Sequence, residues 1–237
     1  MRLFILTLML VIMFLPMSIC SGEITIVPKA DIEVQFNKGY EGDFAGFGLN
    51  ADVESQSYTI GADITMGSLT LTPDIGVWDS KIKISDVVEL DNEVGFTTGL
   101  TAKYDIYKPT KDLTLSLVGA YDYKHSEIDN ITINPWGINL NNPIRNDVTM
   151  FSYEVGPRVT YSGLPINITP YLGIVLSDSS LNIDTELPNL AGLDMSAEEN
   201  IGLRLGFSGQ PIDNLTLGLD VKLIDEEAVA FRAAYAF

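Results

Sequence analysis

The chain is poor in cysteine, histidine and basic residues. Cys20 is the single cysteine, so an intramolecular disulfide is impossible. The 14 basic residues stand against 32 acidic ones, and the formal net charge is -18. Because phosphate contacts require Lys and Arg, nucleic acid is excluded as an expected partner. His125 is the only histidine, and it has no cysteine near it with which to hold a metal ion. We therefore expect no metal and no cofactor.

Long apolar runs are also lacking after the first 15 residues. Leu3–Leu15 is apolar except for Thr7, follows the basic Arg2, and precedes a stretch of small residues that ends at Gly22. This arrangement is typical of a secretory signal, and it is shorter than the about 20 residues of a membrane-spanning helix. The sequence predicts a signal peptide at 1–22 and one domain at 23–237. Bulky Ile19 before Cys20 disfavours lipidation, because that processing motif requires a small residue there.

The rest of the chain consists of alternating segments. Apolar and polar residues alternate with period two over about ten residues at a time, and turn residues separate the segments, as in transmembrane β-strands. We count about ten strands, with eight to twelve compatible with the pattern. The segment Asp31–Asn37 either pairs with Ile24–Val27, which would raise the total to about twelve, or lies outside the sheet. The ten predicted strands are 47–54, 58–66, 69–78, 94–106, 113–122, 151–161, 166–176, 201–207, 215–223 and 228–237.

The predicted connections alternate between short and long. Tight turns at 108–111, 162–165 and 209–212 separate long loops at 80–92, 125–146 and 177–197. Short turns on one side and long loops on the other are typical of an outer-membrane barrel with periplasmic turns and extracellular loops. The predicted fold is therefore all-β, an antiparallel up-and-down transmembrane β-barrel.

Alternation alone does not say whether the apolar face meets lipid or a protein core. Aromatic residues near the predicted strand ends favour lipid, because aromatic side chains form belts at the two membrane interfaces. A soluble periplasmic β-barrel binding protein is the alternative. The predicted outer belt is Tyr58, Tyr121, Tyr123, Phe151 and Tyr153, and the predicted inner belt is Phe47, Tyr104, Tyr107, Tyr161, Tyr235 and Phe237.

The last strand carries the most specific signal. It alternates through Phe231 and Tyr235 and ends on Phe237, which resembles the C-terminal assembly signal of Gram-negative outer-membrane barrels. The whole mature chain resembles small barrels of the opacity-protein, OmpA-barrel or OmpW-like kind. This resemblance implies a cell outer membrane location. It also implies contact with outer-membrane lipids and lipopolysaccharide, and recognition of the last strand by the barrel-assembly machinery.

The polar faces of the strands are predicted to line the lumen. Their charges permit two interpretations: a narrow hydrophilic pore, or a salt-bridge network that fills the barrel, which is slightly favoured because side chains fill barrels of about eight strands. The predicted lumen residues are Asp52, Glu54, Asp63, Asp74, Lys103, Glu154, Arg158, Arg204, Asp220, Lys222 and Arg232.

An enzyme is not expected. His125 and Ser126 are adjacent and would point to opposite faces of a strand, so the histidine would not reach the hydroxyl as a general base. We predict no catalytic residues. The expected role is structural, surface interaction or passive diffusion through a narrow pore, with a lipid-modifying hydrolase that uses His125 as an alternative.

Overall fold

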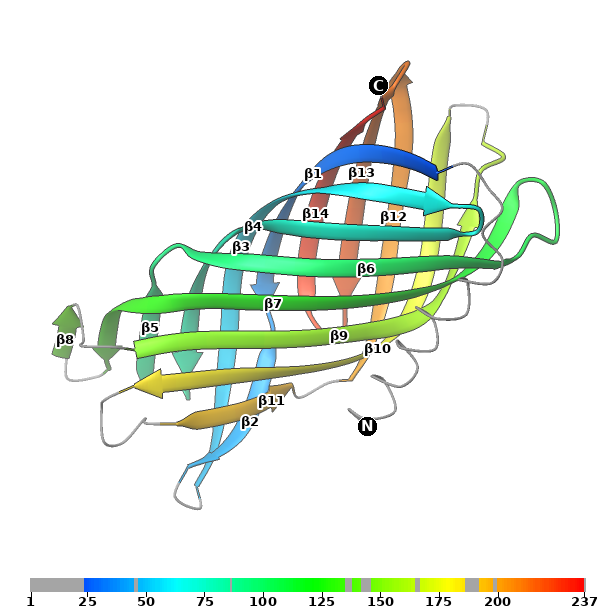
Figure 1. The fold of residues 1–237 in the computed structure, drawn as a ribbon. Coiled ribbons are helices and arrows are strands. Elements are labelled where there is room, and N and C mark those ends of the chain that lie inside the picture. The colour runs from blue at the N-terminus through cyan, green and yellow to red at the C-terminus, as the bar shows by residue number, and fades with distance from the viewer. Residues whose placement is uncertain are drawn as a thin grey trace.

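The computed structural model describes residues 24–44, 47–85, 87–134, 138–141, 146–164, 167–185, 192–197 and 200–236. These residues form a single antiparallel β structure (Figure 1). The predicted signal peptide at 1–22 lies outside the described residues. The strands are β1 (Ile24–Asn37), β2 (Gly39–Phe44), β3 (Phe47–Met66), β4 (Leu69–Ile84), β5 (Val88–Asn92), β6 (Gly95–Tyr107), β7 (Leu113–Ile133), β8 (Ile138–Asn141), β9 (Asn146–Tyr161), β10 (Ile168–Thr185), β11 (Leu193–Ala197), β12 (Ile201–Ile212), β13 (Leu215–Leu223) and β14 (Glu227–Tyr235).

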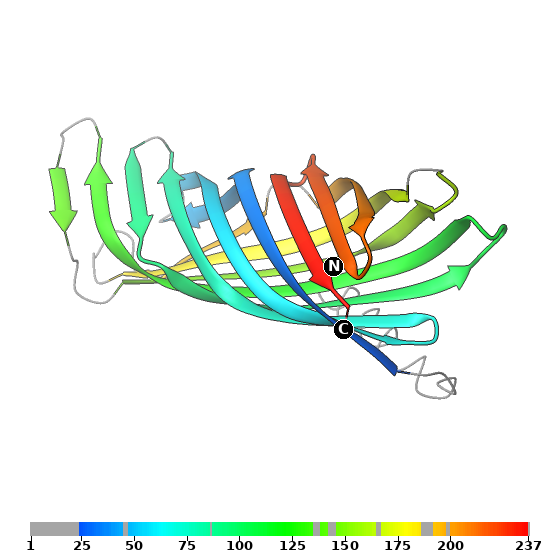
Figure 2. The ribbon, with the colours of Figure 1, turned by 90° about the horizontal axis from the view of Figure 1, so that it is seen from above.

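Ten of these strands close into a barrel, which confirms the predicted fold class. The order around the ring is β1, β3, β4, β6, β7, β9, β10, β12, β13 and β14. The ring closes where β14 pairs with β1, with Lys29 opposite Ala234 and Val34 opposite Val229. Figure 2 shows this pair as the red and dark blue strands side by side.

The total of ten ring strands was right, although the prediction divided one strand in two and left another out of the count. The segments 47–54 and 58–66 are one continuous strand, β3, and the residues from Ile24 to Asn37 form β1, a member of the ring. Asp31–Asn37 therefore neither forms a hairpin with Ile24–Val27 nor lies outside the barrel. The reason for the false break in β3 is a change of apolar face within the strand, described below.

The two ends of the barrel differ. At one end, here the turn end, β3 connects to β4 through Gly67 and Ser68, and β12 connects to β13 through Asp213 and Asn214. β14 also finishes at this end. At the opposite, extended end lie β2, β5, β8 and β11 (Figure 1). The three predicted long loops all fall at the extended end, but much of their length is strand, because β4, β7 and β10 continue into them.

The extensions form a second, smaller ring. β2 follows β1 after Lys38, β5 precedes β6, and β11 precedes β12, so these three short strands continue the wall of the barrel. They pair with the long strands in the order β2, β3, β4, β5, β7, β9, β10 and β11, and β11 pairs with β2 to close the ring. Among the described residues, the β13–β14 hairpin is the part of the ten-strand ring without a continuation. The wall therefore narrows from ten strands to eight, a size at which side chains fill the interior.

The apolar side of the wall changes between the two rings. In β3, Tyr58 and Ile60 face outward and are exposed, while Ser55 and Ser57 face inward. Further along the same strand, Ala51 and Val53 face inward and are buried. Because side chains alternate with period two, this switch needs no irregularity in the backbone; only the sequence pattern shifts by one residue.

The same switch occurs in every long strand. The outward apolar residues of the ten-strand ring give way to inward apolar residues in the eight-strand ring in β4, β7, β9 and β10 as well as in β3. The outward and inward members, in that order, are Ile75 and Ile82 in β4, Tyr123 and Ile128 in β7, Phe151 and Val148 in β9, and Ile174 and Ile183 in β10.

Candidate functional site in the lumen

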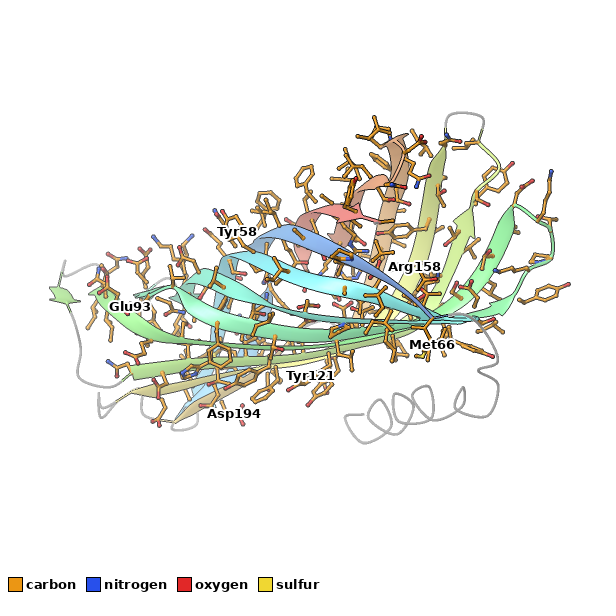
Figure 3. The ribbon with its side chains drawn as sticks, turned by 45° about the horizontal axis from the view of Figure 1, so that its top comes forward. Tyr58, Met66, Glu93, Tyr121, Arg158 and Asp194 are labelled. Atoms are coloured by element: carbon orange, nitrogen blue, oxygen red, sulfur yellow. The ribbon has the colours of Figure 1, made fainter. Side chains whose placement is uncertain are left out.

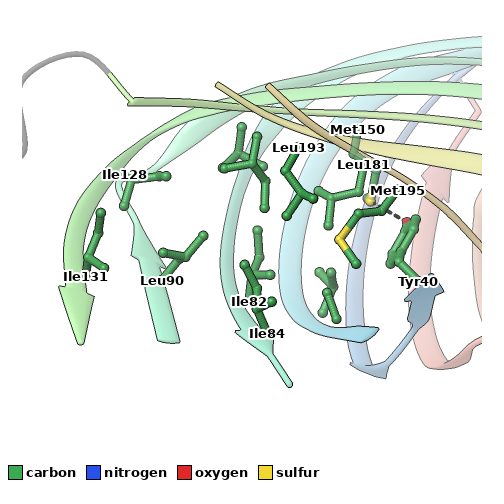
Figure 4. Close-up of a cluster of buried hydrophobic side chains, with 14 of the residues drawn as sticks. Tyr40, Ile82, Ile84, Leu90, Ile128, Ile131, Met150, Leu181, Leu193 and Met195 are labelled. Carbon is green, nitrogen blue, oxygen red and sulfur yellow. Dashed lines mark hydrogen bonds between the residues drawn. The ribbon is translucent and has the colours of Figure 1, made fainter. Parts of the chain in front are cut away.

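The interior of the eight-strand ring is filled by an apolar plug. All eight strands contribute to it, and each of its side chains is at most 4% exposed. The lining of a water-filled channel would be accessible to water, so no continuous water path runs through this set. Figure 4 shows the side chains meeting between the walls of the ring. The plug consists of Tyr40, Ala51, Val53, Trp78, Ile82, Ile84, Leu90, Ile128, Ile131, Val148, Met150, Leu181, Ile183, Leu193 and Met195.

The two largest side chains of the plug keep hydrogen-bond partners. The Trp78 indole Nε1 donates to the carbonyl oxygen of His125 at 3.0 Å. The Tyr40 hydroxyl donates to the sulfur of Met150 at 2.8 Å (Figure 4). Burial raises the pKa of Tyr40, which keeps the phenol neutral. Satisfied polar atoms allow aromatic residues to serve as a core without a large desolvation penalty.

A layer of charged side chains, here called the ion belt, lies against the plug on the side of the turn end. Lys222 Nζ is 2.7 Å from Glu33 Oε2 and 2.9 Å from Glu226 Oε1. Lys124 Nζ on the far wall is 3.9 Å from Glu33 Oε1. β7 and β1 are not neighbours in the ring, so this contact crosses the interior. The belt therefore spans the lumen.

The rest of the ion belt comes from β9, β12, the β13–β14 turn and the junction of β1 and β2. Arg204 donates to Glu154, and its Nη2 is 3.5 Å from Asp225 Oδ2. Lys38 Nζ, at the junction of β1 and β2, is 3.1 Å from Glu226 Oε2. Arg204, Lys38, Asp225 and Glu226 are all at most 5% exposed. Buried charges of this kind require partners, because an isolated ion would lose its hydration without compensation.

Burial and neighbouring charges shift the pKa values of the charged groups at and beside the β13–β14 turn. Burial opposes the charged form of Glu226, but Lys222, Lys38 and Arg204 outweigh it and hold its pKa well below 4.5. Burial also opposes the charged form of Lys38, and Glu226 outweighs it, so the pKa of Lys38 is raised. For Asp225 burial prevails over Arg204, so its pKa is raised.

Below the ion belt, the lumen of the ten-strand ring is polar. The Arg158 guanidinium stacks on the Tyr171 ring at 4.3 Å, and the Tyr171 hydroxyl donates to Asp220. On the opposite wall, Arg232 Nε donates to Asp31 Oδ1 at 2.9 Å and Thr72 donates to Asp63 at 2.6 Å. The Arg232 side chain is 50% exposed, whereas Lys29 and Ala234, which pair nearer the turn end, are buried.

The structure places most of the predicted lumen residues on the inner face. Contacts between non-neighbouring strands mark some of them, such as Arg204 with Glu154 and Lys222 with Glu33. The inward set comprises Asp63, Asp74, Lys103, Glu154, Arg158, Arg204, Asp220, Lys222 and Arg232.

Asp52 and Glu54 were predicted wrongly, because they lie on the outer face of the eight-strand ring. Glu54 Oε1 accepts from Lys83 Nζ at 2.6 Å, and both side chains are exposed. Their inward neighbours are the plug residues Ala51 and Val53. The alternation of 47–54 is compatible with lipid outside or with a protein core inside, and the structure has the protein core inside.

Four of the five residues of the predicted outer aromatic belt form two outward ring pairs, and the fifth, Tyr58, is outward and exposed on β3. Tyr121 and Tyr153 rings are 5.2 Å apart between centroids, and Tyr123 and Phe151 rings are 4.9 Å apart. Phe96 joins Tyr123 at 5.5 Å. In Figure 3, Tyr58 and Tyr121 lie between Met66 at the turn end and Glu93 and Asp194 at the extended end. The belt thus marks the level where the apolar face changes side.

The predicted inner aromatic belt and the predicted terminal signal are only partly found in the structure. Phe47 starts β3 at the extended end, so its predicted place at the turn end was wrong. Phe231 and Tyr235 are outward and exposed on β14. Phe237 lies outside the described residues, so the predicted assembly signal stays a prediction.

Sequence reasoning missed the residues that close the lumen. Glu33, Lys38, Lys124, Asp225 and Glu226 complete the ion belt, and none of them had been assigned to the interior. Glu33 and Lys38 lie in or next to the segment 31–37, for which the sequence leaves open a pairing with 24–27 or a place outside the sheet. The sequence does carry a signal for this inner region. In β10 the apolar residues move from even positions, such as Leu176, to odd positions, such as Leu181, and so from one face of the strand to the other.

No catalytic arrangement forms around His125. Its ring faces outward beside Phe96, and its Nδ1 is 3.3 Å from the Thr149 hydroxyl. Ser126 faces inward and is buried, so the two side chains lie on opposite sides of the wall. Within the described ranges, no group of three or more His, Cys, Asp or Glu is placed to hold a metal ion. The described residues also contain no helix long and apolar enough to cross a membrane.

No family model matches the chain, and no curated protein matches it. Several solved structures are similar to it in shape. The translocator domain of the autotransporter NalP from Neisseria meningitidis is 10% identical, with a TM-score of 0.46, covering 100% of this chain and 98% of that one. The transport unit of the autotransporter AIDA-I from Escherichia coli is 11% identical, with a TM-score of 0.49, covering 99% and 97%. The outer membrane protease OmpT from Escherichia coli is 10% identical, with a TM-score of 0.45, covering 89% and 97%. Similarity this weak carries no activity over to this chain.

Proposed function

We propose that this protein is an integral outer-membrane β-barrel with a closed lumen, whose role is structural or surface interaction rather than passive diffusion. The single observation that carries the proposal is the apolar plug, which seals the eight-strand ring directly above the polar lumen. The ion belt adds a second barrier, because its charges are paired with one another across the interior.

The outer surface of the ten-strand ring supports the membrane part of the proposal. Ile60, Ile75 and Phe231 are 66%, 60% and 56% exposed, and large exposed apolar residues of this kind recur around the ring. Soluble proteins rarely expose contiguous apolar patches of more than a few hundred Å². β13 and β14 are nine residues long, which matches the about 9–11 residues of a membrane-crossing strand. A soluble binding protein would bury this face.

The extended end supports a role at the cell surface. The outward residues of the eight-strand ring are polar, for example Asp52, Glu54 and Asp147, so this part has the surface and the core of a water-soluble domain. Long strands on the side opposite the short turns are expected to face the outside of the cell. We infer that the barrel carries a rigid, acidic body beyond the membrane.

The narrower predictions stay proposals. Contact with lipopolysaccharide, recognition by the barrel-assembly machinery and kinship with opacity-protein, OmpA-barrel or OmpW-like proteins rest on the sequence resemblance. A hydrolase that uses His125 is not proposed, because Ser126 faces the other side of the wall.

Planar-bilayer recording tests the closed lumen. Folded protein, verified by a heat-modifiable gel shift, is expected to insert without conductance. Steady conductance of the wild-type protein would refute the proposal, and altered ion selectivity in Asp63→Asn or Arg204→Gln would trace that current to the lumen. Partition into the aqueous phase without detergent would instead refute the membrane location.

A further inference from the structure

The eight-strand ring closes at a short seam between β2 and β11. The two strands pair over three positions, Tyr40 with Ala197, Glu41 with Ser196 and Gly42 with Met195. Each strand keeps a separate partner, since β2 pairs with β3 over six positions and β11 pairs with β10 over four. Opening the seam would therefore break few backbone hydrogen bonds and would leave both hairpins attached to the wall.

The seam begins directly above the β13–β14 turn. The last pair between β1 and β14 is Asn37 with Glu227, and the first pair of the seam is Tyr40 with Ala197. The turn, residues 224–226, fills the step between these two pairings. Its Glu226 reaches Lys38, which is also bonded through its backbone to Val53 at 3.1 and 3.0 Å. Lys38 thus joins the turn to the base of β2.

The conformation of the turn is unfavourable when considered alone. Ile224 has φ 82°, a region that a β-branched residue rarely adopts. The Asp225 side chain is 1% exposed, and neither carboxylate oxygen has a hydrogen-bond donor. Strain and an unsatisfied buried carboxylate persist only where surrounding contacts compensate for them. Here those contacts are the ion pairs of Glu226 and Arg204.

The plug residue Tyr40 links the seam to the lumen. It is two residues after Lys38, is fully buried, and bonds Met150 on the opposite β9 wall. A movement of β2 away from β11 would withdraw this ring from the plug and leave a polar lumen beneath it.

We propose that the β13–β14 turn is a latch on the β2–β11 seam, and that release of the Lys38–Glu226 ion pair opens the apolar plug so that the barrel conducts. This inference rests on the proposed function, in which the latched barrel spans the membrane and is closed. The described structure then corresponds to the latched, closed state of the barrel.

The test records single-channel activity of the full mature chain after Glu226→Gln and, separately, Lys38→Met. Each variant is expected to show channel openings where the wild type shows none. Removing one partner of a buried ion pair should shift the equilibrium between the latched and the open barrel by about tenfold or more. The matched control is Glu54→Gln, which breaks the exposed pair with Lys83 on the outside of the same ring and is expected to stay silent.

A locking experiment identifies the seam. Glu41 and Ser196 are directly opposite and exposed, and the mature chain has no competing cysteine if the predicted signal is removed, so Glu41→Cys with Ser196→Cys is expected to cross-link when oxidised. Oxidation should abolish the openings of the latch variants, and reduction should restore them. If a latch variant does not fold, Ser196→Asp opposes Glu41 with a like charge and is expected to open the seam directly.

The outcomes separate the two proposals. Folded latch variants and a folded Ser196→Asp variant that remain silent would overturn the latch and leave the closed barrel intact. Openings that persist in the oxidised cross-linked protein would also overturn it, because the current would then bypass the seam. Conductance of the unmodified wild type would instead refute the proposed function.

Discussion

Replacing single residues along β3 tests the switch of the apolar face. Ile60 and Asp52 both point outward from the same strand, eight positions apart, Ile60 in the ten-strand ring and Asp52 in the eight-strand ring. In a soluble barrel, arginine at either position would change the unfolding free energy by no more than about 0.5 kcal/mol, the usual range for exposed sites. In a membrane barrel, arginine at these two positions would change the unfolding free energy by different amounts.

The expected magnitude follows from depth in the bilayer. Arginine on the lipid face destabilises a barrel by about 2–4 kcal/mol at the midplane and by about 0–1 kcal/mol near the interfaces. Ile60 is the next outward position from Tyr58 toward the membrane interior, so we expect Ile60→Arg to lower the unfolding free energy by about 1–2 kcal/mol, between the interface and midplane values. Asp52→Arg should change the unfolding free energy by no more than about 0.5 kcal/mol, because the side chain at position 52 is in water whether the barrel is soluble or spans a membrane. Val53→Arg, which buries a charge in the plug, should exceed about 4 kcal/mol.

Unfolding by denaturant in lipid vesicles measures all three variants on one scale, with the midpoint and slope read from tryptophan fluorescence and the folded fraction from the gel shift. A loss of less than about 0.5 kcal/mol for Ile60→Arg would refute a lipid-facing surface. A large loss of unfolding free energy for Asp52→Arg would instead show that Asp52 points into the barrel, as the sequence pattern predicts.

Two further predictions concern the plug and the ion belt. Leu90→Ala removes a fully buried plug side chain and should lower the unfolding free energy by about 2–5 kcal/mol. Leu217→Ala on the exposed outer face is the control and should lower the unfolding free energy in detergent by less. Equal losses for the two variants would contradict the plug. Stability should also have a plateau in pH. The pKa of Glu226 is lowered from 4.5, so its contribution is present above pH 4.5 and is lost as the pH falls. The pKa of Lys38 is raised from 10.5, so its contribution is present below pH 10.5 and is lost as the pH rises. Thermal unfolding of wild type and Glu226→Gln across this range checks the sign, because the variant should lack the acid limb assigned to Glu226.

The sequence by itself determined the class of fold and the apolar face of most strands. Period-two alternation in segments such as Leu215–Leu223 specifies a strand and its apolar face, because side-chain direction is a local property of extended backbone. The asymmetry of short turns and long connections likewise indicated which end is extended. The total of ten ring strands followed from counting, although two errors of boundary cancelled in that count.

Only the tertiary structure decided whether each apolar face points into the barrel or away from it. Ala51 and Val53 alternate in the same way as Tyr58 and Ile60, and nothing within the strand says that the first pair is buried in a plug and the second is exposed on the outer surface. That distinction depends on pairing partners far away in the chain, such as β11 closing against β2, which narrows the ring until side chains fill it. The ion belt is hidden for the same reason. Lys38 and Glu226 are 188 residues apart in the chain, and closure of the barrel brings them together.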